Sequence, residues 1–298
     1  QQHLVNHVRD LKAPMDGLIL MMAHVYPLSV VMLKAISSSE TVAQALFEEA
    51  KGYSYIKTLP DNSISLHDVM RDMVNEFVWP QIPAKDKRLS WYSQKVLKYF
   101  KKIIKRIEEE IDSLEKQAEK PKKRPDKQGA LRTELERKRQ QIWVIREQLL
   151  KHSLIADIDD GLMVFIQIYE DASTDKRITL RPQFIKLVEQ KRDQLSQKQA
   201  ALLDYHRADQ LFSQDDYAFA RNITEELLQI KTLPLDLKIK SIKLRGNIKI
   251  RQGEVDEAIE DFRKAVAMSK DLKHTVLLIQ STNALGWAYK TRGDLDQA

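Results

Sequence analysis

Apolar residues recur with helical spacing along most of this 298-residue chain, and most sharply between residues 100 and 149. Two runs there repeat at intervals of four and three, which is the heptad pattern of a coiled coil. The first run is Phe100, Ile104, Ile107, Ile111, Leu114 and Ala118, and the second is Leu131, Leu135, Lys138, Ile142, Ile145 and Leu149. The segment "EKPKKRPDKQG" between them contains two prolines and a glycine, which favour a reversal of the chain. We therefore predict an antiparallel coiled-coil hairpin over residues 83–153, whose seam is interrupted only by Lys138.

Residues 15–82 show a different order of patterns. Three apolar helices are expected, ending near Val25, Ala35 and Ala50, and the third opens on "SSSE" in capping-box order. The period then changes to two in "YSYIKTL" and "SISL", which flank the turn-forming "PDNS" and predict a β-hairpin. Helical spacing returns in Leu66, Val69, Met70, Met73 and Phe77. Three helices, a two-stranded wing and a closing helix are typical of a winged-helix domain.

From about residue 154 the chain is expected to be helical to its end, and a repeat of small and aromatic positions emerges. In "LRGNIKIRQGEVDEAIEDFRKAV" these positions are Gly246, Gly253, Ala258, Phe262 and Ala265, and "LGWAYKTRGDLDQA" repeats them with Gly286, Tyr289, Gly293 and Ala298. A weaker copy contains Ala208 and Ala220. Small residues let paired helices approach, and the aromatic ring fills the groove between them. The pattern resembles tetratricopeptide repeats, which implies an α-solenoid over residues 154–298.

Composition and charge agree with a mainly α protein. Glycine (8) and proline (9) are scarce, and the absence of cysteine excludes disulfides and thiolate metal sites. The net charge of +6 is concentrated in residues 85–151, which hold 21 lysines and arginines against 11 aspartates and glutamates. Such a basic hairpin suits a solvated surface, nucleic acid or an acidic partner. The longest apolar stretch, "GLILMMAHVYPLSVVML", is interrupted by His24 and Pro27, so no membrane span is expected.

The triplet Leu66-His67-Asp68 follows the predicted wing directly and has two interpretations. In the first, Ser65 and Asp68 form a capping box at the start of a helix, and His67 has no role of its own. In the second, the imidazole binds an anion among the unpaired amides of the helix start. The choice depends on the context of the triplet.

A winged helix that runs into Leu-His-Asp and is followed by tetratricopeptide-like repeats resembles the signal-transduction ATPases with numerous domains (STAND), of the NB-ARC and NACHT type. Their Met-His-Asp motif corresponds to Leu66, His67 and Asp68 here, with leucine in place of methionine. The resemblance implies that His67 contacts the β-phosphate of ADP and that Asp68 holds the turn. This contact would latch the inactive state until a protein or peptide ligand at the repeats permits exchange to ATP and homo-oligomerisation. It also implies a cytoplasmic protein active in signalling or defence, and the coiled-coil hairpin is not part of the common pattern.

Other features limit what this chain does alone. None of its eight glycines precedes lysine, so a Gly-x-x-x-x-Gly-Lys phosphate loop is absent and the chain by itself is not expected to be an enzyme. Residues 1–14 resemble the end of a preceding helical domain that stops at Pro14, and the first residue is Gln1, so we expect a piece of a longer protein. Its histidines never form His-Glu-x-x-His, and no metal site is predicted.

Two alternatives to the STAND interpretation belong to other classes. The first is a DNA-binding regulator, whose third helix would present Gln44 and Lys51 to DNA, among Glu40, Glu48 and Glu49. The second is a scaffold whose repeats and coiled coil only assemble partners. Salt-dependent binding to duplex DNA distinguishes the first, and partner binding that survives deletion of residues 15–82 distinguishes the second.

Overall fold

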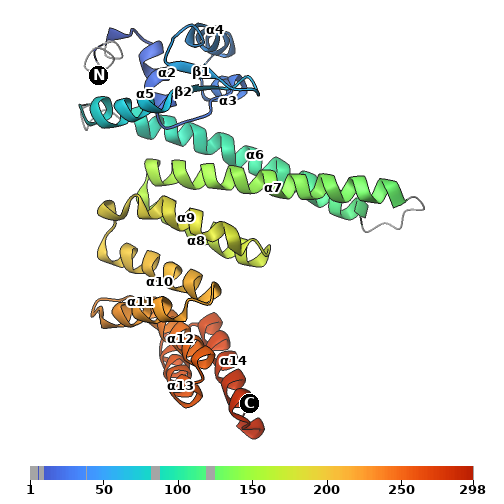
Figure 1. Cartoon of the computed structure of the whole chain (residues 1–298), viewed down its shortest axis with the longest axis vertical. Helices are drawn as coiled ribbons and strands as arrows, with labels where there is room; N and C mark the ends of the chain where they lie inside the picture. Colours follow the sequence, from blue (N-terminus) through green and yellow to red (C-terminus); the bar gives the residue numbers. More distant parts are fainter. Residues whose placement is uncertain (1–5, 7–9, 38, 82–87, 119–124, 298) are drawn as a thin grey trace. The chain divides into compact units, whose positions relative to one another are not determined.

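The computed structural model describes the chain except for residues 1–5, 7–9, 38, 82–87, 119–124 and 298 (Figure 1). Helices dominate the described residues, and one small antiparallel sheet accompanies them, as the mainly α expectation requires. The chain divides into two compact units, residues 1–164 and 165–298, and the division falls within helix α8 (Ile158–Thr174). The domain boundaries expected after residues 14, 82 and 153 remain predictions. Most of the segment expected to end a preceding helical domain lies outside the described residues.

From Met15 onward, the first unit has three helices that are followed by a β-hairpin and a short helix. They are α2 (Met15–Met22), α3 (Val30–Ile36), α4 (Glu40–Ala50), β1 (Ile56–Thr58), β2 (Ile64–Leu66) and α5 (Asp68–Met73). A π-helical turn (Val74–Val78) and a 3-10 turn (Trp79–Gln81) continue α5. Helix α2 is apolar and buried on nearly all sides, which places it in the core of the unit.

Local side chains explain where these elements begin. Ser29 and Ser39 accept hydrogen bonds from backbone amides of α3 and α4. The capping box expected in "SSSE" is therefore wrong, because Ser39 itself caps α4 and Glu40 is already the first helical residue. In the turn of the hairpin, Asn62 has a φ of 61°, and the Asp61 carboxylate accepts from the Ser63 amide at 3.0 Å. Hydrogen bonding from Ser63 lowers the pKa of Asp61.

The hairpin is joined to the helices by its inner strand. Ile56 pairs with Leu66 and Thr58 with Ile64 in an antiparallel register. Leu28, between α2 and α3, exchanges two backbone hydrogen bonds with Ile64, at 2.8 and 2.9 Å. Every residue of β2 is buried, so the strand is part of the core and fixes the start of α5 beside it.

Helices α6 (Arg88–Ala118) and α7 (Pro125–Ala156) pack side by side and antiparallel, as predicted for the coiled coil (Figure 1). Ile107 and Ile142 of the seam are buried. Lys138, the interruption of the seam, forms an ion pair with Glu110 of the opposite helix, and Arg139 contacts Glu115 at 2.6 Å. The reversal predicted at "EKPKKRPDKQG" is shorter than this segment, because α7 begins at Pro125, its second proline. Proline is tolerated at the first position of a helix, since the amide hydrogen that it lacks would have no partner within the helix there. Residues 119–124 of the reversal lie outside the described residues.

The second unit is a succession of antiparallel helices. After α8 come α9 (Arg181–Glu189), α10 (Gln197–Ser213), α11 (Tyr217–Gln229), α12 (Leu235–Gln252), α13 (Val255–Asp271) and α14 (Thr275–Arg292). Its apolar residues form small clusters between neighbouring helices rather than one central core, as in a repeat protein. Gly246 faces the ring of Phe262, to which a Cβ at position 246 would come within 2.7 Å. The small and aromatic positions of the repeat thus meet where α12 and α13 pack. Ala298 lies outside the described residues.

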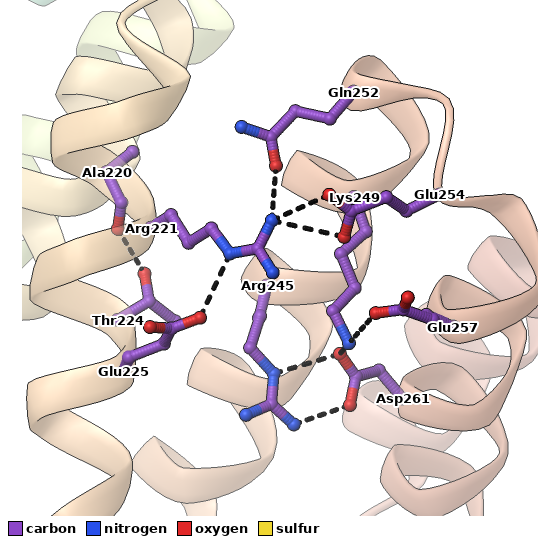
Figure 2. Close-up of polar contacts among 10 residues, drawn as sticks. All are labelled: Ala220, Arg221, Thr224, Glu225, Arg245, Lys249, Gln252, Glu254, Glu257 and Asp261. Atoms are coloured by element: carbon purple, nitrogen blue, oxygen red, sulfur yellow. Dashed lines mark hydrogen bonds and ion pairs between the residues drawn. The ribbon is translucent and has the colours of Figure 1, made fainter.

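Charged contacts fix α11, α12 and α13 to one another (Figure 2). Arg221 of α11 donates to the Glu254 carboxylate at the start of α13, at 2.8 and 3.1 Å. Arg245 of α12 forms two hydrogen bonds with Asp261 of α13, and Lys249 lies 3.1 Å from the same carboxylate. Because the side chain of Asp261 is only 7% exposed, its two cationic partners compensate a charge that would otherwise be costly to bury. These contacts set the axial position of each helix against the next.

Candidate functional site

His67 is the residue immediately before α5, and Asp68 is the first residue of that helix. The His67 backbone amide donates to the Tyr55 carbonyl at 2.9 Å, which anchors the turn. The imidazole is exposed and has no hydrogen-bond partner among the described residues. The capping-box interpretation is wrong, because Ser65 belongs to β2 and its hydroxyl donates to the Leu66 carbonyl. The helix therefore begins without a side-chain cap.

Asp68 links the start of α5 to the hairpin. Its carboxylate lies 3.6 Å from the ammonium of Lys57 on β1 and 2.9 Å from the guanidinium of Arg71 on the next turn. Lys57 and then Arg71 lower the pKa of Asp68. The carboxylate is exposed, so these pairs orient the helix start more than they stabilise the fold.

A cation-aromatic cluster lies next to this helix and reaches the coiled coil. The Arg71 guanidinium is 4.3 Å from the centre of the Tyr26 ring, and the Lys151 ammonium of α7 is 3.7 Å from it. Tyr26 therefore interacts with two cations from two different elements. Burial, with a contribution from Arg71, lowers the pKa of Lys151 to about 8.

This lowered pKa predicts a pH-dependent stability. Between pH 8 and 10.5 an unfolded chain keeps the Lys151 proton and the folded chain loses it, so the stability of the wild type should rise with pH in that range. The Lys151→Met variant should lack this rise. Thermal unfolding of the first unit between pH 7 and 9.5 tests the difference, below the range in which tyrosines ionise. Lys116→Met, at an exposed position of α6, should keep the wild-type profile, and parallel profiles for wild type and Lys151→Met would contradict the assignment.

A pocket of about 490 Å³ lies within the second unit. It is lined by α8, α9, α10, α12 and the start of α14, whereas α11 and α13 contribute nothing. Its residues recur at intervals of four and three within a helix, as in Asp236, Lys240 and Lys243 of α12. Each helix therefore turns one face to the pocket. From α10 onward the lining comes from alternate helices, which makes this the inner face of the repeat stack.

One wall of the pocket is a compensated polar cluster. The Asp209 carboxylate lies 3.2 Å from the Arg181 guanidinium and accepts from the Tyr169 hydroxyl at 2.9 Å. Arg181 also donates to Ser173 and lies over the Tyr169 ring, 4.1 Å from its centre. Burial raises the pKa of Tyr169 and lowers that of the neighbouring His206 to about 3, so both side chains are neutral near pH 7. The charged groups of this wall therefore pair with one another within the protein.

Helix α12 contributes two cations to the pocket that form no ion pair among the described residues. Lys240 and Lys243 lie one turn apart on α12, and no carboxylate is within ion-pair distance of either ammonium among the described residues. The Lys243 ammonium donates to the Gln280 side chain of α14 at 2.7 Å. Burial, and then the charge of Lys240, lowers the pKa of Lys243. The charge of Asp209 acts in the opposite direction on that pKa, so the cations of α12 are compensated in part within this unit.

Sequence reasoning missed this pocket entirely. The available signal was the spacing of Asp236, Lys240 and Lys243 on one face of the same helix. Such spacing is common on solvated helices, and only the packing of five helices turns it into a wall. Conversely, His67 and Asp68 lie in the first unit and are adjacent in space as in sequence.

The side chains that the DNA-binding alternative requires already form contacts within the protein. On α4, the Gln44 side chain donates to Glu48 at 3.2 Å, and the Lys51 ammonium lies 3.0 Å from the same carboxylate. Lys51 also reaches Asn62 in the turn of the hairpin. These contacts leave few free donors for base edges on the third helix.

Among the described residues, no group of three or more histidine, aspartate or glutamate side chains is arranged to hold a metal ion. None of the described helices is both long and apolar enough for a membrane span.

No protein-family model and no curated protein matches the chain. Among solved structures, it is similar to the crystal structure of a signal-transduction ATPase with numerous domains (STAND) that has a tetratricopeptide repeat sensor, from Pyrococcus horikoshii. The TM-score is 0.39 and the sequence identity is 11%. The similarity covers 98% of this chain and 50% of that protein, so the chain spans about half the length of its structural neighbour.

Proposed function

We propose that this chain is the regulatory and ligand-sensing part of a STAND ATPase, with its sensor in the second unit. The observation that carries the proposal is the pocket on the inner face of α8–α14, where Lys240 and Lys243 lack carboxylate partners. A stack of helix pairs presents a continuous inner surface, and protein or peptide ligands suit such a surface. Unpaired, partly buried charges cost stability, and a ligand of opposite charge would remove that cost.

In the first unit, residues 15–82 act as a winged-helix domain that responds to the nucleotide. His67 contacts the β-phosphate of ADP held by a nucleotide-binding domain outside this chain, and Asp68 keeps the start of α5 in place through Lys57 and Arg71. The exposed imidazole without a partner fits this role, since a phosphate oxygen would accept from it. Ligand at the repeats then favours the ATP-bound state, in which the protein forms homo-oligomers. The coiled-coil hairpin connects the two functions along the chain.

Release of ADP from the whole protein tests the latch. His67→Ala should release a fluorescent ADP analogue about tenfold faster or more, because a hydrogen bond to a charged group contributes roughly 1.5–3 kcal/mol. Basal oligomerisation should rise with it. Asp72→Ala, one turn further along α5 at an exposed position, should leave the release rate unchanged. Equal rates for wild type and His67→Ala would exclude the latch.

A further inference from the structure

The N-terminal half of α6 carries positive charge that the proposed function does not use. Between Arg88 and Ile107 the helix has seven lysines and arginines and no aspartate or glutamate. At about 100° per residue, four of its exposed lysines fall within an arc of about 100° around the helix axis. The buried Val96 and Phe100 lie on the other side of the helix. The α6 lysine surface is defined by these four exposed residues: Lys98, Lys101, Lys102 and Lys105.

The α6 lysine surface differs from cations further along the hairpin in its lack of partners. None of the four lysines forms an ion pair or a hydrogen bond with another described residue. Further along, Lys138 and Arg139 of α7 contact Glu110 and Glu115 of the opposite helix. Like charges three or four residues apart on a helix repel one another. A polyanion bound across the surface would remove this repulsion.

The surface is short and continuous. From Lys98 to Lys105 the helix rises about 10 Å, at ~1.5 Å per residue. Glu109 and Asp112 follow on the same face of α6 and end the run of positive charge. Over the same length, a nucleic-acid duplex carries about six phosphate charges. The spacing of the lysines therefore suits one stretch of a duplex backbone.

The side chains around the lysines restrict the class of partner. None of the exposed large apolar side chains among the described residues belongs to α6. The core of a protein-protein interface is apolar and depleted of lysine, and a helix that lies on a membrane needs an exposed apolar face. Single-stranded nucleic acids stack on exposed aromatic rings, whereas Tyr99 of α6 is partly buried against the core of the unit. These observations favour a polyanion that is bound by charge alone.

We infer that the α6 lysine surface binds the phosphate backbone of a nucleic-acid duplex without reading its sequence. Duplexes of DNA and of RNA both present such phosphate oxygens, and lysine binds them as a point charge. The contact differs from base recognition by α4, whose Gln44 and Lys51 already form contacts within the protein. It is also independent of the nucleotide latch and of the pocket in the repeats.

Binding of fluorescent duplexes to the intact chain tests the inference. Glutamine replaces lysine in both variants, because the two have similar helix propensities. The surface variant carries Lys98→Gln, Lys101→Gln, Lys102→Gln and Lys105→Gln. The control variant loses the same charge at four exposed positions of the second unit, through Lys198→Gln, Lys264→Gln, Lys270→Gln and Lys290→Gln. Circular dichroism checks that both variants are folded.

Fluorescence anisotropy measures the affinity of each protein for duplex DNA, for duplex RNA and for a single strand of the same sequence, between about 50 and 200 mM salt. Vesicles of phosphatidylcholine and phosphatidylserine, and a polyglutamate peptide, serve as the other polyanions. The two duplexes distinguish the two sources of the phosphates.

The wild type and the control variant should bind duplex DNA with a slope of log affinity against log salt of about −3.6 or steeper, since each phosphate contact contributes ~0.9. Their affinity should therefore fall about 100-fold or more across this salt range. The surface variant should lose most of the slope and bind about tenfold more weakly or worse at the lowest salt. Equal affinities of the wild type and the surface variant, no binding of either duplex by the wild type, or tighter binding of single strands, vesicles or polyglutamate would overturn the inference.

Discussion

Phe262→Ala should destabilise the packing of α12 against α13 by about 3–5 kcal/mol, the usual cost of emptying a large aromatic site in a core. The Phe262 side chain is fully buried, and its ring covers Gly246 of the neighbouring helix. Because each helix pair of the second unit has its own small apolar cluster, little other material is available to fill the cavity. Hydrogen exchange of the α12 and α13 amides measures the local free energy of opening. Phe219→Ala, at a 64% exposed position of α11, should change it by less than about 0.5 kcal/mol.

Changing Gly246, the residue that the Phe262 ring covers, tests whether this contact or only the loss of buried apolar area causes the destabilisation. Gly246→Ala places a Cβ 2.7 Å from the Phe262 ring and should cost about 1–3 kcal/mol by overpacking. Combined with Phe262→Leu, the same glycine change should cost less than it does alone, since the smaller side chain leaves room. Strictly additive effects, or a Phe262→Ala variant as protected from exchange as the wild type, would show that the two residues do not form this contact.

The second large effect is expected at the wall of the pocket where Asp209 contacts Arg181 and Tyr169. Asp209→Ala should destabilise the second unit by about 3–5 kcal/mol, because it leaves the Arg181 charge buried without its carboxylate. The Arg181 side chain is only 9% exposed, and the Tyr169 hydroxyl would keep only the His206 carbonyl as an acceptor. Hydrogen exchange of the α8, α9 and α10 amides measures this loss within the same unit.

Glu170→Ala is the matched control for this change. Glu170 lines the same pocket, but it is exposed and forms no ion pair among the described residues. Its removal should therefore change stability by less than about 0.5 kcal/mol. Similar losses for Asp209→Ala and Glu170→Ala would mean that the net charge of the pocket matters and that the buried pair does not.

Several expectations from the sequence failed for a common reason. Val69 and Phe77 fit the helical spacing of a buried stripe, yet Val69 is 70% exposed and Phe77 is 36% exposed. Ser65 and Asp68 have capping-box spacing, yet Ser65 is in a strand. Spacing reports which residues share a face if an element forms, but it does not report where the element begins or what covers the face. Those properties depend on β2, which is held by Leu28 and therefore determines the start of α5.

The sequence by itself determined the helical character of this protein, the paired seams of α6 and α7, and the small and aromatic residues where repeat helices meet. These features follow from intervals of three, four and about forty residues, which are properties of a single chain segment or of a repeated one. Only the tertiary structure decided that Arg181, Asp209, Lys240, Lys243 and Gln280 surround one pocket. They belong to four helices, and their distances depend on how each helix packs on the next, which no local pattern encodes. The same packing determines which charges form ion pairs and which ones do not.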